Sequence, residues 1–156
     1  MAVSAVVQGV PCREHLHQPL MDRLADECES VQLSIDADYR GSVFGLRQAL
    51  QVALSFPTDW CLIIEDDVNL CPDAVALTMA LAGRTEANHA GISLFMPPKN
   101  YPETRYRAGY CALSGLSLFG PGLLLKSEVA EKYLNAESNY KGTSKDSHLI
   151  SFFVIA

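Results

Sequence analysis

The chain has 156 residues, of which 49% are hydrophobic and 19% charged, a balance that predicts one folded domain and excludes a disordered chain. The formal net charge of −6 and the sequence pI of about 5.1 exclude a broad basic surface for nucleic acid or anionic lipid. Any bound phosphate must therefore be met locally, by a metal ion, a few arginines or backbone N–H groups.

The cysteines and the N-terminus indicate the compartment. The five cysteines are odd in number and show no C-x-x-C spacing, which argues against a disulfide framework or a zinc site and favours a reducing cytoplasm. The first ten residues lack a positively charged region, so they predict a strand rather than a signal peptide. No apolar run approaches the roughly eighteen residues of a membrane span.

The first half of the chain alternates between strand and helix patterns. We expect strands at Ala2 to Val7, at Val31 to Ile35 and from Trp60, and helices at Glu14 to Cys28, from Ser42, and from Pro72 to Leu81. Pro19 must lie in the first turns of its helix or split it, and Ser42 is the expected N-cap of the second helix. This order predicts an α/β fold with a mostly parallel sheet flanked by helices on both faces.

The second half is less regular. Ile92 to Met96 and Tyr110 to Phe119 read as strands, separated by a long proline-rich loop. After the turn at Gly120 to Gly122 we expect a short strand and then a helix capped by Ser127. The apolar end, Leu149 to Ala156, could pair with a second copy of the chain, which makes a homo-oligomer one expectation.

The most informative stretch is Trp60 to Asp73, in which an apolar strand pattern ends in Glu65, Asp66 and Asp67. Adjacent carboxylates repel one another, and a hard divalent ion such as Mg²⁺ or Mn²⁺ is the usual compensation. Strand alternation predicts Glu65 and Asp67 on one side and Asp66 on the other. The alternative is a solvated turn, because Asn69, Pro72 and Asp73 are also turn and helix-start residues.

The order of several motifs resembles a known family. Tyr39-Arg40, Val43-Phe44-Gly45, Phe56-Pro57, Ile64 to Val68, Pro72-Asp73, Phe119 to Leu125 and Lys145-Asp146 follow one another as in the donor domain of N-acetylglucosaminyltransferase I and its relatives. The chain also resembles short glycosyltransferase-like proteins of some bacteriophages. The resemblance covers Asp36 to Phe153; it implies a GT-A, Rossmann-like fold and an inverting glycosyltransferase that takes its sugar from a nucleotide-sugar donor, with a UDP-sugar favoured.

The resemblance also implies roles for the acids. Asp67 would bind Mn²⁺ or Mg²⁺ directly, Glu65 would act through metal-bound water, and Asp66 would hold ribose or sugar hydroxyls. Asp146 matches the general base that would activate the hydroxyl acceptor, although a helix N-cap is an alternative for this residue.

Further donor contacts are expected at strand ends. Gln8, Arg13 and Asp36 stand where such proteins hold the nucleotide base, while a solvated arginine and a turn aspartate are the alternatives for the last two. Arg40 and Arg47 are candidates for the diphosphate, and Arg47 fits a surface helix position equally well. The histidines show no metal-ligand spacing and are interpreted as ordinary polar residues, with His148 also a candidate on the acceptor side.

Two departures from the family pattern keep other functions open. Asp38 stands where the family has histidine before its Tyr-Arg pair, and the chain ends at Ala156 where relatives continue with a loop that closes over the donor. The main alternative function is that of a non-catalytic remnant of the same fold that binds a nucleotide-sugar or a metal. A glycoside hydrolase with Asp67 and Asp146 as paired carboxylates is a third possibility, and it predicts activity in chelator.

Overall fold

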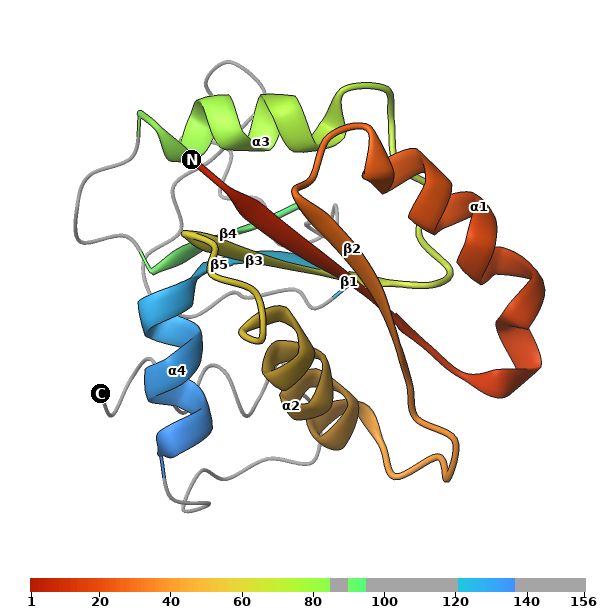
Figure 1. Ribbon diagram of the computed structural model, residues 1–156. Coiled ribbons are helices and arrows are strands. Elements are labelled where there is room, and N and C mark those ends of the chain that lie inside the picture. Colours follow the sequence, from red (N-terminus) through yellow and green to blue (C-terminus); the bar gives the residue numbers. More distant parts are fainter. Residues whose placement is uncertain (85–89, 95–120, 137–156) are drawn as a thin grey trace, which may run out of the picture.

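The computed structural model of the protein describes residues 1–84, 90–94 and 121–136. This part of the chain forms five strands and four α-helices, and a short 3₁₀ helix, η1, precedes the first α-helix (Figure 1). In chain order the elements are β1 (Val3–Gly9), η1 (Pro11–Arg13), α1 (Glu14–Ala25), β2 (Ser30–Ile35), α2 (Ser42–Ala53), β3 (Trp60–Glu65), α3 (Ala74–Ala82), β4 (Gly91–Ser93), β5 (Gly122–Lys126) and α4 (Ser127–Asn135).

The strands form one mixed sheet in the order β2-β1-β3-β5-β4. β1 is parallel to both of its neighbours, whereas β5 runs antiparallel to β3 and β4. The parallel register places Gln8 of β1 between Ser34 of β2 and Glu65 of β3. The predicted α/β fold is therefore confirmed, with three adjacent parallel strands at one side of the sheet and a reversed strand at β5.

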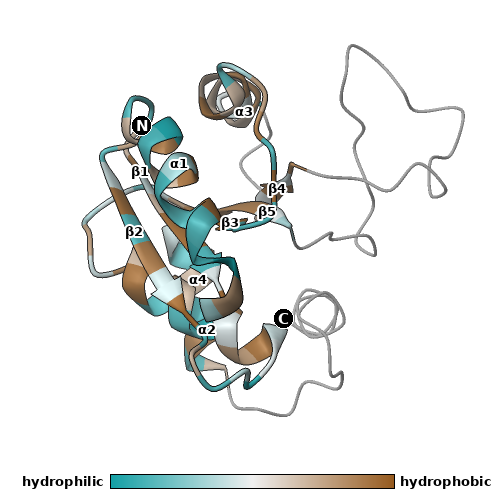
Figure 2. Ribbon diagram, turned by 90° about the vertical axis from the view of Figure 1, so that its right-hand side faces the viewer, coloured by the Kyte–Doolittle hydropathy of each residue, from teal (hydrophilic) through white to brown (hydrophobic). Residues whose placement is uncertain are grey.

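Helices cover both faces of the sheet, as predicted: α1 and α3 lie on one face and α2 and α4 on the other (Figure 1). In β3, Cys61 and Ile63 pack toward α2 and α4, while Leu62 and Ile64 pack toward α1 and α3. Because each strand residue faces a covered side, β3 is apolar in every position before Glu65. Figure 2 shows that α1 is largely teal and α3 largely brown.

Three local expectations need correction or refinement. Gly41, not Ser42, is the N-cap of α2, and its φ of 102° explains why a glycine stands there. Ser127 does not cap α4; its hydroxyl donates to the Thr58 carbonyl at 2.7 Å and so ties α4 to the loop before β3. Pro19 lies inside α1 without splitting it.

Several predictions fall on residues outside the described ranges. They concern the second half of the predicted strand at Ile92 to Met96, the proline-rich loop, the strand at Tyr110 to Phe119, Asp146 and the apolar end at Leu149 to Ala156. Within the described part of the chain, no helix has both the length and the apolar composition that crossing a membrane requires.

Candidate functional site

The carboxyl ends of β1, β2 and β3 lie side by side at one edge of the sheet. From β1 the chain first moves to β2 on one side and then crosses back to β3 on the other, with α1 and α2 on opposite faces of the sheet. This reversal makes a topological switch point between β1 and β3, the position at which open α/β sheets bind their ligands. The residues that follow these two strands are therefore the first candidates for a site.

Asp66 is the buried centre of this edge, with no side-chain exposure. Its Oδ2 accepts a hydrogen bond from the Val10 backbone N–H at 3.1 Å and lies 2.9 Å from Nε2 of His17. Since an ionised carboxylate only accepts hydrogen bonds, the contact with His17 requires a proton on Nε2. These contacts give a buried carboxylate the partners it needs and fix the turn after β3 against the loop after β1.

Arg13 bridges Asp66 and Asp67. Its Nη2 lies 2.9 Å from Oδ1 of Asp66, and its Nη1 donates to Oδ2 of Asp67. The contact with Asp66 has the distance of an ion pair but not the alignment of a hydrogen bond, because Oδ1 has no hydrogen-bond partner among the described residues. The Asp66 side chain is fully buried and that of Asp67 is 49% exposed, so the two ion pairs differ strongly in solvent screening.

The predicted alternation of the three acids does not extend past the strand. β3 ends at Glu65, and Asp66 and Asp67 form a turn. One guanidinium contacts both aspartates, so Asp67 lies toward Arg13 and η1 with Asp66 rather than sharing the opposite side with Glu65. The period of two fails here because it belongs to extended backbone only.

Gly9 provides the space for this arrangement. A Cβ at this position would lie 2.4 Å from Nε2 of His17 and 2.9 Å from Oδ2 of Asp66. The end of β1 must therefore be bare, that is, without a side chain at Gly9, so that His17 and Asp66 can meet beside it.

Asp36, predicted to contact the nucleotide base, is buried and holds the loop after β2. Its Oδ1 accepts from the Arg40 backbone N–H and its Oδ2 from that of Gly41, both at 2.9 Å. The Arg40 guanidinium lies 3.7 Å from the centre of the Phe44 ring. In the same loop Tyr39 is exposed with a φ of 54°, and a side-chain hydrogen bond with Cys12 raises its pKa. The loops after β1 and β2 thus contact each other above the sheet edge.

Gln8 lies beneath α2 on the same face as its register partners Ser34 and Glu65. Its amide nitrogen would stand 2.5 Å from a Cβ on Gly45, so the glycine lets α2 approach the strand. Gln8 Oε1, Ser34 Oγ and Gln48 Oε1 are buried without hydrogen-bond partners among the described residues. These three buried oxygens lie where the ends of β1 and β2 meet α2, and their hydrogen-bonding capacity is not used within the described part of the chain.

The other candidates fall elsewhere or outside the described ranges. Arg47 donates to the Leu134 carbonyl at 2.7 Å and lies over the Tyr133 ring, so it holds the last turn of α4 instead of facing the crevice. Asp146, the predicted base, is outside the described residues.

The acidic turn offers hard oxygen donors, which are the ligands that Mg²⁺ and Mn²⁺ prefer. Among the described residues, however, no group of three or more His, Cys, Asp or Glu side chains gathers to hold an ion. These donors therefore fit an ion that takes most of its ligands from water and phosphate, with one or two carboxylates from the chain, and do not fit a cage made by protein alone.

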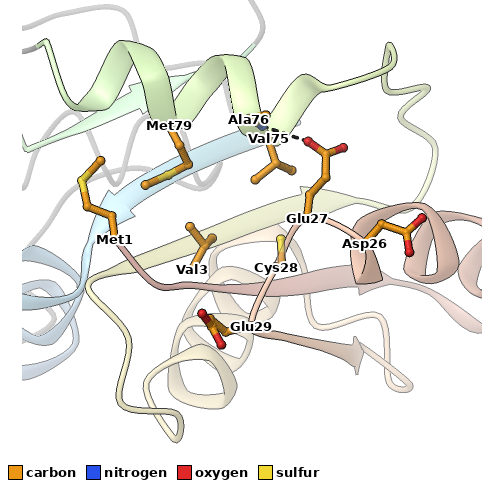
Figure 3. Close-up of a pocket in the computed structure, with 9 residues that line it drawn as sticks. All are labelled: Met1, Val3, Asp26, Glu27, Cys28, Glu29, Val75, Ala76 and Met79. Carbon is orange, nitrogen blue, oxygen red and sulfur yellow. Dashed lines mark hydrogen bonds between the residues drawn. The ribbon is translucent and has the colours of Figure 1, made fainter.

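A cavity of about 470 Å³ lies at the opposite end of the sheet, where β1 begins (Figure 3). Val3, Cys28, Val75 and Met79 contribute its apolar lining, and Asp26, Glu27 and Glu29 are acidic residues around it. Glu27 is already engaged, because it accepts from the Ala76 N–H at 2.9 Å and pairs with Arg23. Burial, followed by the charge of Glu27, raises the pKa of the Cys28 thiol to about 12.

Sequence reasoning missed His17, which it treated as an ordinary polar residue. The available signal was its position: His17 lies on the stripe of α1 that also buries Leu20 and Leu24, one turn after Arg13. A polar residue on a buried stripe needs a partner, and Asp66 is that partner.

Comparisons with known proteins add no assignment. A scan against models of known protein families finds no match, and a search of curated proteins finds no similar sequence. The function must therefore be argued from the residues at the edge of the sheet.

Proposed function

We propose that the protein is a small GT-A type glycosyltransferase that binds a nucleoside diphosphate sugar at the β1/β3 edge and transfers the sugar to a hydroxyl acceptor. The observation that carries the proposal is the meeting of Arg13, from the loop after β1, with Asp66 and Asp67, from the turn after β3, at the switch point of the sheet. The order of motifs from Asp36 onward supports the same reading.

Some of the described residues are proposed to contact the metal and the donor, and others hold the surrounding loops in place. Asp67 is half exposed and is the proposed metal ligand, with Glu65 acting through water. Arg13 and the exposed Arg40 supply positive charge for a diphosphate. Gln8 and the buried Asp36 and Asp66 stand at the strand ends where the base and ribose would bind, and the existing hydrogen bonds of both aspartates hold the surrounding loops in place.

The reaction proposed is an in-line displacement. Mn²⁺ or Mg²⁺, when bound with the donor, supplies Lewis acidity and neutralises the charge of the diphosphate leaving group. The chain orients the donor at the acidic turn, and Asp146 accepts the proton of the acceptor hydroxyl as the new glycosidic bond forms.

The first experiment is calorimetric titration with UDP and with GDP, each with Mn²⁺ and with chelator. We expect metal-dependent binding of one nucleotide in the unmodified chain and its loss in Asp67→Ala. Asp26→Ala is the matched control, because it removes an exposed acid at the opposite end of the sheet and is expected to bind as the unmodified chain does.

Failure of both nucleotides to bind, with or without metal, would overturn the proposal. If binding is found, nucleotide sugars are screened for hydrolysis and transfer, with Asp146→Asn expected to abolish turnover while keeping donor binding.

A second candidate is a nucleotide-sugar binding module without catalysis, a remnant of the same fold. The pairing of Asp67 with Arg13 favours it, because the acidic turn then has a cation of its own. This candidate predicts binding that persists in chelator and in Asp67→Ala, which the same titration separates from the enzyme.

A further inference from the structure

The acidic turn already carries a cation, the guanidinium of Arg13. Arg13 is the residue just before α1, and its side chain reaches the two aspartates after β3, more than fifty positions along the chain. Its two terminal nitrogens are divided between the aspartates, Nη2 near Asp66 and Nη1 on Asp67. Arg13 thus occupies the side of the turn on which a cation compensates both carboxylates.

The two halves of this bridge are held differently. The Asp66 half is buried, and Asp66 has His17 and the Val10 N–H as additional partners. The Asp67 half is open to water, because the Arg13 side chain is 34% and the Asp67 side chain 49% exposed. Solvent screens the outer ion pair far more than the inner one, so the outer one exchanges partners more easily.

Asp67 is the carboxylate for which the two cations compete. Its Oδ2 already accepts from the guanidinium, and a divalent ion bound by the same carboxylate would bring two positive charges next to a third. Ligation by Asp67 therefore favours release of Nη1. The Nε of Arg13 is buried without a hydrogen-bond partner among the described residues, so that nitrogen does not lock the guanidinium in place.

We propose that Arg13 is a built-in counter-cation that competes with the divalent ion for Asp67. The inference rests on the proposed function for the identity of the ion and concerns the regulation of that site. When metal binds alone, the guanidinium that it displaces gains no new partner. When metal binds together with a diphosphate, the displaced guanidinium can bind the phosphate oxygens. Arg13 thereby disfavours metal binding in the absence of the nucleotide.

The test is a titration of the full chain with Mn²⁺ alone, followed by calorimetry and by the electron paramagnetic resonance signal of free Mn²⁺. We expect Arg13→Gln to bind Mn²⁺ about tenfold more tightly than the unmodified chain, within the range of coupling between linked sites. Arg23→Gln is the matched control. Arg23 also has a 34% exposed side chain and pairs with an acid, Glu27, and its loss changes net charge equally. Its Mn²⁺ affinity is expected to stay within about twofold of the unmodified value.

Because Asp66 loses its counter-charge in Arg13→Gln, Arg13→Lys is titrated as well. Lysine keeps a positive charge for Asp66, but its single ammonium lacks the fork that spans both aspartates, so tighter Mn²⁺ binding is again expected. Circular dichroism confirms that each variant is folded.

The inference would be overturned if both Arg13 variants bound Mn²⁺ no more tightly than the unmodified chain. It would also be overturned if Arg23→Gln raised the Mn²⁺ affinity as much as Arg13→Gln does, or if none of the proteins bound Mn²⁺. Failure of the proposed function looks different: neither nucleotide binds to the unmodified chain, whatever Mn²⁺ does in the Arg13 variants.

Discussion

Gly9 lies at the end of β1, where a side chain would collide with the two groups that hold the acidic turn. In Gly9→Ala the new Cβ would stand 2.4 Å from His17 Nε2 and 2.9 Å from Asp66 Oδ2, so one of these groups must move. We expect a loss of about 1–3 kcal/mol in the free energy of unfolding, the range for overpacking a filled interior. Urea unfolding measures it.

The control for this prediction is Gly83→Ala. Gly83 has a φ of −67° at the end of α3, and a Cβ there would meet Met1 Cε at an ordinary 3.5 Å. Alanine should leave stability unchanged or raise it by up to about 1 kcal/mol. Equal unfolding midpoints for the two variants would show that the His17–Asp66 contact does not require a bare strand end.

Cys28 links the stability of the fold to pH through its raised pKa. Its pKa of about 12 exceeds the ordinary value of 9.0, so the folded chain keeps a proton that the unfolded chain loses between these pH values. By linkage, its contribution to stability is full below pH 9.0 and decreases as pH rises toward about 12.

The same shift predicts low reactivity of this thiol. At pH 8 the thiolate population of Cys28 should be about a thousandfold below that of an ordinary thiol, because the pKa values are 9.0 and about 12. We expect alkylation, followed by peptide mass spectrometry, to label the exposed Cys12 well before Cys28. Labelling of both at one rate would contradict the burial of this thiol.

Arg47 connects elements on one face of the sheet, since it extends from α2 to the final carbonyls of α4. Its Nη2 donates to the Leu134 carbonyl at 2.7 Å, and its guanidinium lies 5.6 Å from the centre of the Tyr133 ring. Arg47→Gln should lose about 1.5–3 kcal/mol of unfolding free energy, the scale of a charged hydrogen bond. Urea midpoints measure the loss, and nucleotide binding should be unaffected.

Arg40→Gln is the companion variant. Arg40 is exposed and its guanidinium lies over Phe44, so its removal should cost only about 0.5–1 kcal/mol. A larger loss from Arg40 than from Arg47, or weakened nucleotide binding in Arg47→Gln alone, would reverse the roles assigned to the two arginines.

At the scale of the whole molecule, both apolar cores share the central strands. Val6 and Ile63 contribute to one core, and their neighbours Val7 and Ile64 to the other. Loss of either core therefore removes the support of the other, which predicts one cooperative unfolding transition.

Trp60, the only tryptophan, reports this transition because it is 5% exposed at the start of β3. We expect its fluorescence and the far-ultraviolet circular dichroism signal to change at the same urea concentration. Separate midpoints would indicate that the two faces unfold independently. Trp60→Phe identifies the fluorescence change as that of the buried indole.

The fold class was predictable because it depends on local periodicity. The apolar run from Cys61 to Ile64 and the helix pattern after Ser42 each carry their structure in a few adjacent residues. Helix caps were predicted less well, although Ser42 and Ser127 are typical N-cap residues. Gly41 caps α2 instead of Ser42, and the Ser127 hydroxyl donates to the carbonyl of Thr58, which is distant in sequence. The antiparallel direction of β5 could not be predicted from the sequence either, because strand direction depends on pairing across the sheet.

The sequence by itself determined an α/β domain with acids at a strand end, because strand and helix periods and the acidic triplet are properties of neighbouring residues. Only the tertiary structure decided which cation meets these acids. Arg13, His17 and the bare strand end at Gly9 converge on Asp66 and Asp67 across about fifty positions of chain. That convergence follows from the parallel pairing of β1 with β3, a long-range contact that the periodicity of neighbouring residues does not reveal.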